Sequence, residues 1–228
     1  MHKTIFFSVL TALSLYGARP LVTDDARLTN PYSCQLESYT KHTTFVNDFW
    51  LLPACNPTGN LEYTLGVGRS YNQSNTFDNI SLQAKTLFHP LQTNGYGIGI
   101  AAGVTTNTIS DTYQNQIGSL YGYIPVSFSF NNDQIILHLN GGMVHDTQSY
   151  NTFGTYGIGS EITISEHLFG VTEVYGDTTG ELFWQGGSRL WLIPNKLQMD
   201  MTYGAGGNDF HQWVTFGLRI LGSEWFRH

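Results

Sequence analysis

The strongest constraint on this chain is a two-residue alternation of apolar and polar side chains that returns along most of its length. From Leu61 to Val67 every second residue is apolar, and the same period recurs in residues 80–88 and 120–130. Successive side chains of a β-strand point to opposite faces, so this period predicts strands with one apolar and one polar face. No helical period of useful length appears in the same region.

The alternation defines ten strands directly. Two more flank a polar tip at residues 43–48, which gives twelve in total. The predicted strands are residues 34–40, 49–55, 61–69, 80–88, 95–104, 120–130, 134–140, 156–164, 168–176, 182–192, 197–204 and 214–220. The alternation leaves the two faces ambiguous in 168–176.

The links between these strands alternate in length without exception. The short ones are residues 57–59, 90–94, 131–133, 165–167 and 194–196; the longer ones are 71–79, 105–119, 145–152, 177–180 and 204–211. Bacterial single-chain membrane barrels have an even number of strands, short periplasmic turns and longer outer loops. The fold class predicted is therefore all-β, an antiparallel transmembrane β-barrel of about twelve strands over residues 34–228.

Composition favours this barrel over the competing architecture, a soluble β-sandwich. Charged residues make up 12% of the chain and hydrophobic residues 41%, whereas a soluble domain normally carries about twice that charged share. The apolar faces are long enough for tilted strands to cross a bilayer, so outer-membrane lipid is the expected surrounding. The net charge of −7 argues against a nucleic-acid partner, which requires a basic surface.

The first residues have the pattern of a secretory signal peptide, predicted at residues 1–18. His2 and Lys3 precede an apolar stretch at residues 5–15, and Gly17 and Ala18 are the small residues before the break. Residues 19–33 are polar and are predicted to form a periplasmic N-terminal segment. Its charged residues either plug the barrel, bind a partner or belong to a solvated tail, and the tail is the preferred interpretation.

Two cysteines, Cys34 and Cys55, are present in this exported chain. Folding 34–40 and 49–55 as a hairpin places them opposite each other, which is the proximity that a disulfide needs. We therefore predict a disulfide that joins the first hairpin near the periplasm. Two free buried thiols are the alternative.

Residues 19–26, with the sequence RPLVTDDA, resemble the mature N-terminus of outer-membrane barrels named after the MetA pathway of phenol degradation. Residues 52–62 resemble the same family. The resemblance implies a location in the bacterial outer membrane and defines no activity or catalytic residue. Assembly machinery of the outer membrane is an expected partner, although the terminal Trp225–His228 departs from the usual aromatic end of such barrels.

Charged side chains of both signs are predicted on the inner face of the barrel: Glu62, Lys85, Glu161, Arg189, Asp200 and Arg219. They form either a structural network of paired charges or a constriction that selects a small solute. Many other inner positions are glycine, including Gly95, Gly97 and Gly99, and these predict free space. Aromatic residues near strand ends are expected at the two membrane interfaces: Phe88, Tyr96, Phe130, Tyr156, Tyr203 and Trp213.

The function predicted from these features is passive passage of a small solute through a narrow channel, and a small aromatic or hydrophobic compound is conceivable through the resemblance. A closed-lumen structural or interaction barrel is the alternative. A rim hydrolase is a third, with its candidate residues in two outer loops: His145, Asp146, Thr147 and Ser149 in one, and Asp209 and His211 in the other. Because the sequence has no G-x-S-x-G motif and no metal-ligand spacing, neither an enzyme nor a cofactor or metal is predicted.

Overall fold

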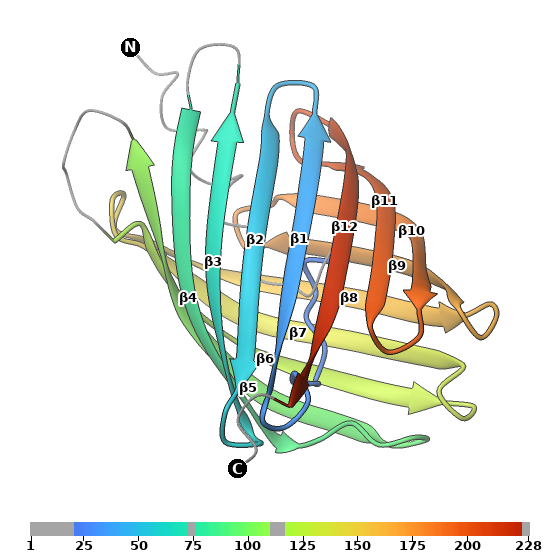
Figure 1. Ribbon diagram of the computed structural model, residues 1–228. Coiled ribbons are helices and arrows are strands. Elements are labelled where there is room, and N and C mark those ends of the chain that lie inside the picture. Colours follow the sequence, from blue (N-terminus) through green and yellow to red (C-terminus); the bar gives the residue numbers. More distant parts are fainter. Residues whose placement is uncertain (1–20, 73–75, 110–116, 225–228) are drawn as a thin grey trace.

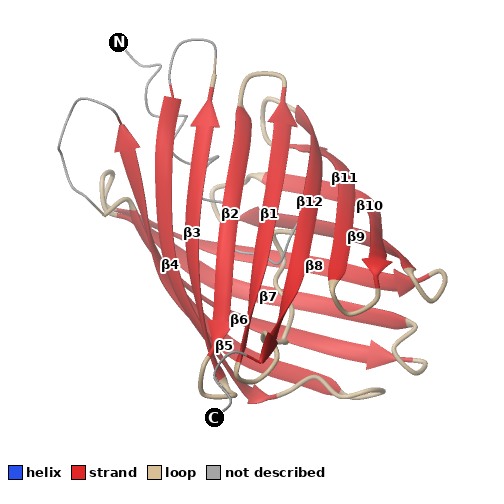
Figure 2. Ribbon diagram, in the orientation of Figure 1, coloured by secondary structure: helices blue, strands red, loops and turns tan. Residues whose placement is uncertain are grey.

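The computed structural model describes residues 21–72, 76–109 and 117–224, and these form one closed antiparallel barrel. Figures 1 and 2 show its strands wrapping around a central space. The strands are β1 (Ser33–Thr43), β2 (Asn47–Asn56), β3 (Leu61–Tyr71), β4 (Thr76–His89), β5 (Tyr96–Ile109), β6 (Ser119–Phe130), β7 (Ile135–Asp146), β8 (Asn151–Thr163), β9 (Leu168–Asp177), β10 (Leu182–Ile193), β11 (Leu197–Gly206) and β12 (His211–Glu224). Among the described residues, no helix is long and apolar enough to cross a membrane.

Each strand pairs with its neighbours in the sequence, and β1 pairs with β12 to close the barrel. The seam runs without interruption from Gln35, opposite Leu221, to Thr43, opposite Trp213. Closure satisfies the backbone hydrogen bonds that a sheet edge would leave open inside a bilayer. The predicted fold class and the count of twelve strands are therefore confirmed, while the predicted signal peptide and the C-terminal aromatics lie outside the described residues.

The outer surface of the barrel is apolar around its middle. Leu65 and Leu82 lie directly opposite each other in the β3–β4 ladder and expose 45% and 52% of their surface. Nearer the outer loops, exposed polar pairs follow, such as Arg69 with Asp78 at 2.6 Å. An apolar band bounded by polar groups is the surface that matches a lipid bilayer.

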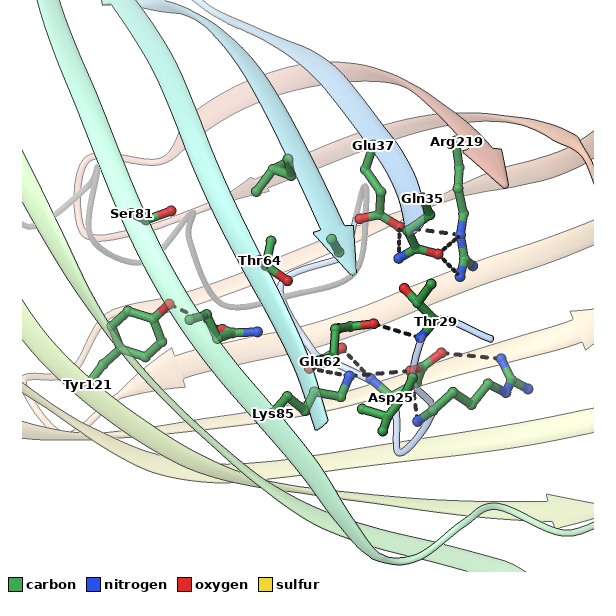
Figure 3. Close-up of a pocket in the computed structure, with 16 residues that line it drawn as sticks. Asp25, Thr29, Gln35, Glu37, Glu62, Thr64, Ser81, Lys85, Tyr121 and Arg219 are labelled. Atoms are coloured by element: carbon green, nitrogen blue, oxygen red, sulfur yellow. Dashed lines mark hydrogen bonds and ion pairs between the residues drawn. The ribbon is translucent and has the colours of Figure 1, made fainter. Parts of the chain in front are cut away.

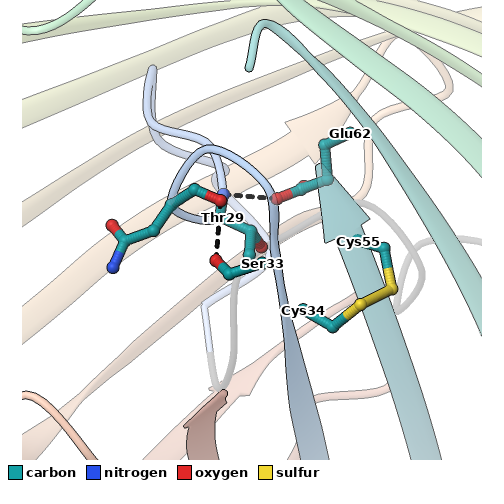
Figure 4. The surroundings of a disulfide bond; sticks show 6 residues. Thr29, Ser33, Cys34, Cys55 and Glu62 are labelled. Carbon is teal, nitrogen blue, oxygen red and sulfur yellow. Dashed lines mark hydrogen bonds between the residues drawn. A yellow bond between two sulfur atoms is a disulfide. The ribbon is translucent and has the colours of Figure 1, made fainter. Parts of the chain in front are cut away.

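A disulfide joins Cys34 of β1 to Cys55 of β2, as predicted (Figure 4). The two residues are direct partners in the β1–β2 ladder, with their Cα atoms 4.0 Å apart. Beside it, the backbone N–H of Tyr32 donates to the carbonyl of Asn56, and the Asn56 side-chain amide donates to the carbonyl of Thr29 at 2.8 Å. The disulfide therefore lies where the N-terminal segment joins the barrel wall.

The glycines of the inner face do not leave free space, which corrects the expectation for them. A Cβ on Gly97 would lie 2.6 Å from the backbone nitrogen of Leu91, because the β4–β5 turn folds against that wall. Toward the outer end, aromatic rings lie directly over glycines of the neighbouring strand. A Cβ on Gly204 would lie 2.5 Å from the ring of Trp213. Glycine here makes room for an aromatic ring inside the barrel.

Trp213 also corrects the predicted interfacial aromatics. It is 4% exposed and packs in the lumen with Tyr175 and Phe183, because β12 turns its alternate face outward with Phe216, Leu218 and Ile220. The other predicted interfacial residues do face outward and are between 44% and 69% exposed: Phe88, Tyr96, Phe130, Tyr156 and Tyr203.

Candidate functional site

We call residues 21–32 the N-terminal segment, and residues 21–29 of it run inside the barrel (Figure 1). Ala26 is fully buried, and Thr23 and Asp24 are 2% and 4% exposed. The preferred interpretation of a solvated tail is therefore wrong for these residues. That interpretation rested on the polar composition of the segment, but the barrel wall provides hydrogen-bond or ion-pair partners for several of the polar groups that the segment brings inside.

Four backbone N–H groups of the segment donate to side chains of the wall. Those of Val22 and Thr23 donate to the two carboxylate oxygens of Glu173, each at 2.7 Å. The N–H of Ala26 donates to the hydroxyl of Ser127 at 2.8 Å. The segment belongs to no helix or strand, and unpaired buried N–H groups are costly, so these acceptors on the wall help to fix its path.

The N–H of Thr29 donates to Glu62 at 2.6 Å near the periplasmic end (Figure 4). From there to Glu173 the four contacts reach wall residues on β3, β6 and β9. The segment is thus attached to several sides of the barrel and occupies the centre of the lumen.

Ion pairs hold the middle of the segment. The ammonium of Lys85 lies 2.8 Å from Asp24 and 3.7 Å from Asp25, and Figure 3 shows Lys85, Glu62 and Asp25 converging. Arg27 lies 3.3 Å from Glu161 and from Asp25. Lys85 and Asp24 are both buried, so their contact replaces hydration that the two charges lose, whereas the Arg27 side chain is partly exposed.

The two aspartates respond differently to this environment. Burial raises the pKa of Asp24 from 3.8 to about 6, although the nearby Lys85 opposes the rise. Burial also acts to raise the pKa of Asp25, but Lys85 and Arg27 together hold it below its ordinary value. Asp25 is therefore the more firmly ionised partner of the two basic side chains.

The predicted inner charges all face the lumen. Glu62, Lys85, Glu161 and Arg189 are between 4% and 8% exposed and Asp200 is fully buried, while the Arg219 side chain is 24% exposed. Each lies in the periplasmic half of its strand. Together they form a charged belt, which we define as Glu37, Glu62, Lys85, Glu161, Arg189, Asp200 and Arg219.

Pairs within the charged belt run along the wall. Arg189 lies 2.7 Å from Asp200, its direct partner in the β10–β11 ladder, and Arg189 also contacts Glu161. Arg219 lies 3.4 Å from Glu37, its direct partner in the β1–β12 seam (Figure 3). Asp200 and Glu37 come from the neighbouring strand, and Glu161 on β8 is one strand further from Arg189 on β10, so these pairs follow the wall.

Sequence reasoning missed two wall groups that hold the segment, Glu173 and Ser127. For Glu173 the signal was hidden by the ambiguous alternation of β9, in which Val171, Glu173 and Tyr175 all face inward. The alternation in residues 120–130 turns Ser127 to the inner face, but nothing in the sequence shows that its hydroxyl accepts a bond from a distant backbone N–H.

Free space in the lumen is divided into separate cavities that the N-terminal segment helps to line. One of about 60 Å³ lies against Asp24 and Asp25 (Figure 3). A second of about 30 Å³ lies against Val22 and Thr23. A third cavity, of about 580 Å³, is lined in part by Arg27 and lies at the periplasmic end. With the segment in place, the lumen is occupied between its two ends.

The residues predicted for a rim hydrolase do not form a catalytic arrangement. Asp146 accepts from the backbone N–H of Ser149 at 3.2 Å, so it caps its own turn. His145 contacts Thr152 at 2.8 Å, and His211 lies 4.0 Å from Asp209. Within the described part of the chain, no group of three His, Cys, Asp or Glu residues is placed to hold a metal ion.

A closed barrel with an apolar outer band and a polar, occupied lumen defines an outer-membrane β-barrel protein of the bacterial type. Within that class, the chain belongs to the family described as "Uncharacterised conserved protein UCP029691", whose model matches residues 9–221. A comparison with curated proteins finds no match.

Solved structures with a similar fold are outer-membrane barrels. The KdgM porin in complex with disordered oligogalacturonate has a TM-score of 0.62 at 9% identity, over 82% of this chain and 98% of that one. The COG4313 outer membrane channel from Pseudomonas putida F1 has a TM-score of 0.59 at 11% identity, over 86% and 98%. Outer membrane phospholipase A from Escherichia coli reaches 0.52 at 10%, over 84% and 94%.

At these identities the likeness concerns the fold. It confirms the outer-membrane barrel that the resemblance of residues 19–26 and 52–62 implied. The more specific name, the MetA-pathway barrels, is not confirmed, since the matching family model is a different one.

Proposed function

We propose that this protein is a narrow outer-membrane channel for a small solute and that the N-terminal segment closes it. One observation carries the proposal: two charge pairs of the belt, Arg189 with Asp200 and Arg219 with Glu37, lie between neighbouring strands along the wall. The N-terminal segment occupies the lumen between the wall residues Glu62 and Glu173. A barrel of this size has an interior between that of filled small barrels and that of aqueous porins.

The way the segment is attached supports its removal. It joins the wall at Ser33, at the periplasmic end of β1. If the signal peptide is cleaved after Ala18, as the sequence predicts, the segment is a short free end that can leave toward the periplasm without threading a loop. Its bonds to the wall are polar, and water can replace them.

A closed-lumen structural barrel is the second candidate, and the burial of Lys85 with Asp24 and Asp25 favours it. Separating these groups exposes Lys85 inside a lumen where Glu62 is its remaining direct partner in the β3–β4 ladder. Breaking a buried ion pair costs several kcal/mol, on the order of 3–5, so a barrel that never opens is consistent with the same contacts.

A covalent tether distinguishes the two candidates. A Cβ built on Gly157 lies 3.4 Å from the Cβ of Thr23, close to the spacing of a disulfide. The variant Thr23→Cys/Gly157→Cys is expected to lock the segment in the lumen when oxidised. The measurement is single-channel conductance of the folded, signal-free protein in a planar bilayer, before and after reduction.

For the channel, we expect conductance steps in the reduced tethered variant that oxidation abolishes. The unmodified protein, treated identically, controls for reduction of Cys34–Cys55. A variant without residues 19–30 is expected to conduct continuously once its folding is verified by heat-modifiable gel mobility. If this folded variant is silent as well, the wall itself closes the lumen and the structural barrel is the correct function.

The solute is a separate question. Oligogalacturonate, named with the KdgM porin, is a polyanion, and the inner face of this barrel carries more acidic than basic side chains.

A rim hydrolase, in line with the fold of the phospholipase, receives no support from His145 or His211. Replacing both by Ala should leave any hydrolysis by purified protein unchanged.

A further inference from the structure

The lumen has a second region of unusual character between Glu173 and the outer mouth. Its buried acidic side chains are Asp48, Glu173 and Asp177 on the strands and Glu181 in the β9–β10 loop. Among the described residues that face this region, Lys41 is the basic one. In the charged belt, which lies nearer the periplasm, the acidic and basic side chains nearly balance in number, because Lys85, Arg189 and Arg219 are paired with acidic partners.

The wall around these acids is aromatic. Tyr175, Phe183 and Trp213 form one buried cluster, and Val22 of the N-terminal segment packs against it. The ammonium of Lys41 lies 4.4 Å from the centre of the Trp213 ring, a distance at which a cation is attracted to the ring face. The structure thus already contains one ammonium group on this wall.

Glu173 is the acid that the N-terminal segment covers. Its two carboxylate oxygens accept from the adjacent N–H groups of Val22 and Thr23, both at 2.7 Å, and Gln185 donates to one of them at 2.5 Å. A guanidinium binds a carboxylate in the same way, by donating two parallel N–H groups to its two oxygens. When the segment leaves, Glu173 keeps Gln185 and loses both backbone donors.

Two further acids in this region have an oxygen with no hydrogen-bond partner. They are Oδ1 of Asp48 and Oδ2 of Asp177, and the two residues are 9% and 2% exposed. Buried acceptors without partners are uncommon, and each leaves capacity to accept a bond from a donor. Acidic groups with spare acceptor capacity on an aromatic wall suit a solute that is positively charged and carries N–H groups.

We propose that the lumen from Glu173 to the outer mouth binds and passes small organic cations of the ammonium or guanidinium type, with Glu173 as the group that the N-terminal segment occupies in the closed state. The proposal rests on the channel function proposed above. It replaces the neutral aromatic or hydrophobic solute with a charged one that uses the same aromatic wall.

The test uses the folded variant without residues 19–30 in a planar bilayer with a KCl gradient. The sign of the reversal potential is expected to show preference for K⁺ over Cl⁻. Adding guanidinium chloride at low concentration is expected to reduce the K⁺ current. In Glu173→Gln on the same background, the concentration for half-block should rise roughly tenfold, the effect of losing one charge-assisted contact.

Asp78→Asn is the matched control, because it removes one acidic charge from the exposed outer face. It should leave both the reversal potential and the guanidinium block unchanged. Conduction that is unselective or prefers Cl⁻ would overturn the proposal and leave the channel function standing. A cation preference with a block that Glu173→Gln does not alter would overturn the role of Glu173. Silence of the folded variant would instead refute the channel on which the proposal rests.

Discussion

At the scale of single residues, glycine and aromatic side chains determine how the lumen is filled. Trp213 lies over Gly204 and Trp50 lies over Gly68. In each pair the ring occupies the volume that a Cβ on the neighbouring strand would take. The sequence shows the alternation that turns these glycines inward, but it does not show that a ring from the next strand covers them.

Gly204→Ala is expected to destabilise the barrel, because the new Cβ would lie 2.5 Å from the Trp213 ring and would force this ring to move. Overpacking of this kind costs about 1–3 kcal/mol. The measurement is urea unfolding in lipid vesicles, followed by gel mobility. Gly141→Ala is the control, since a Cβ there meets nothing within 4 Å, and equal losses in both variants would refute the packing argument.

The buried guanidinium of Arg189 is the second residue-scale feature, because it contacts both Asp200 and Glu161. Arg189→Met keeps much of the side-chain volume but leaves the buried carboxylates without their shared partner, which is expected to cost about 3–5 kcal/mol. Arg69→Met removes an arginine from an exposed pair with Asp78 and should have a much smaller effect in the same unfolding measurement. A loss in Arg189→Met no larger than that in Arg69→Met would contradict this reading.

At the scale of elements, the strands were predictable and the N-terminal segment was not. Two-residue alternation depends on the pleat, which is local, and the alternating link lengths indicated a barrel with an even number of strands. The position of residues 21–32 depends on acceptors that lie far away in the sequence, such as Glu173, which is 150 residues from Thr23. A polar composition is equally compatible with water and with a lumen lined by acceptors, so composition alone favoured the solvated tail.

The disulfide tests how the first hairpin supports the segment. Cys34 and Cys55 are 21 residues apart in sequence, and a cross-link of that length stabilises by roughly 3 kcal/mol through the unfolded state. Cys34→Ser/Cys55→Ser should lower the unfolding free energy accordingly. It should also increase protease access to residues 21–32, because the anchor at Asn56 loosens. Unchanged protease protection would show that the wall contacts alone hold the segment.

At the scale of the whole molecule, the barrel separates two environments with opposite requirements. Its outer face offers Leu65, Leu82 and similar side chains to lipid, while its inner face encloses the charged belt and the N-terminal segment. Both follow from one period of two residues, since a strand that faces lipid on one side must face the lumen on the other. This link is why the sequence could place Glu62 and Lys85 inside the barrel without predicting what they bind.

The position of the membrane can be tested by the folding free energy that is lost when a charge is placed on the outer face. Leu65 is 45% exposed and lies near the middle of β3, so Leu65→Arg should cost about 2–4 kcal/mol of folding free energy in a bilayer, as lipid-facing arginines do at the midplane. Tyr71 is equally exposed at 45% but ends β3 on the outer side, where an arginine can reach the headgroups. Tyr71→Arg should therefore cost about 0–1 kcal/mol. Urea unfolding of both variants in vesicles gives the comparison, and equal costs would mean that the membrane does not lie along the apolar band. Because both substitutions face away from the lumen, neither should alter a conductance that depends on the N-terminal segment.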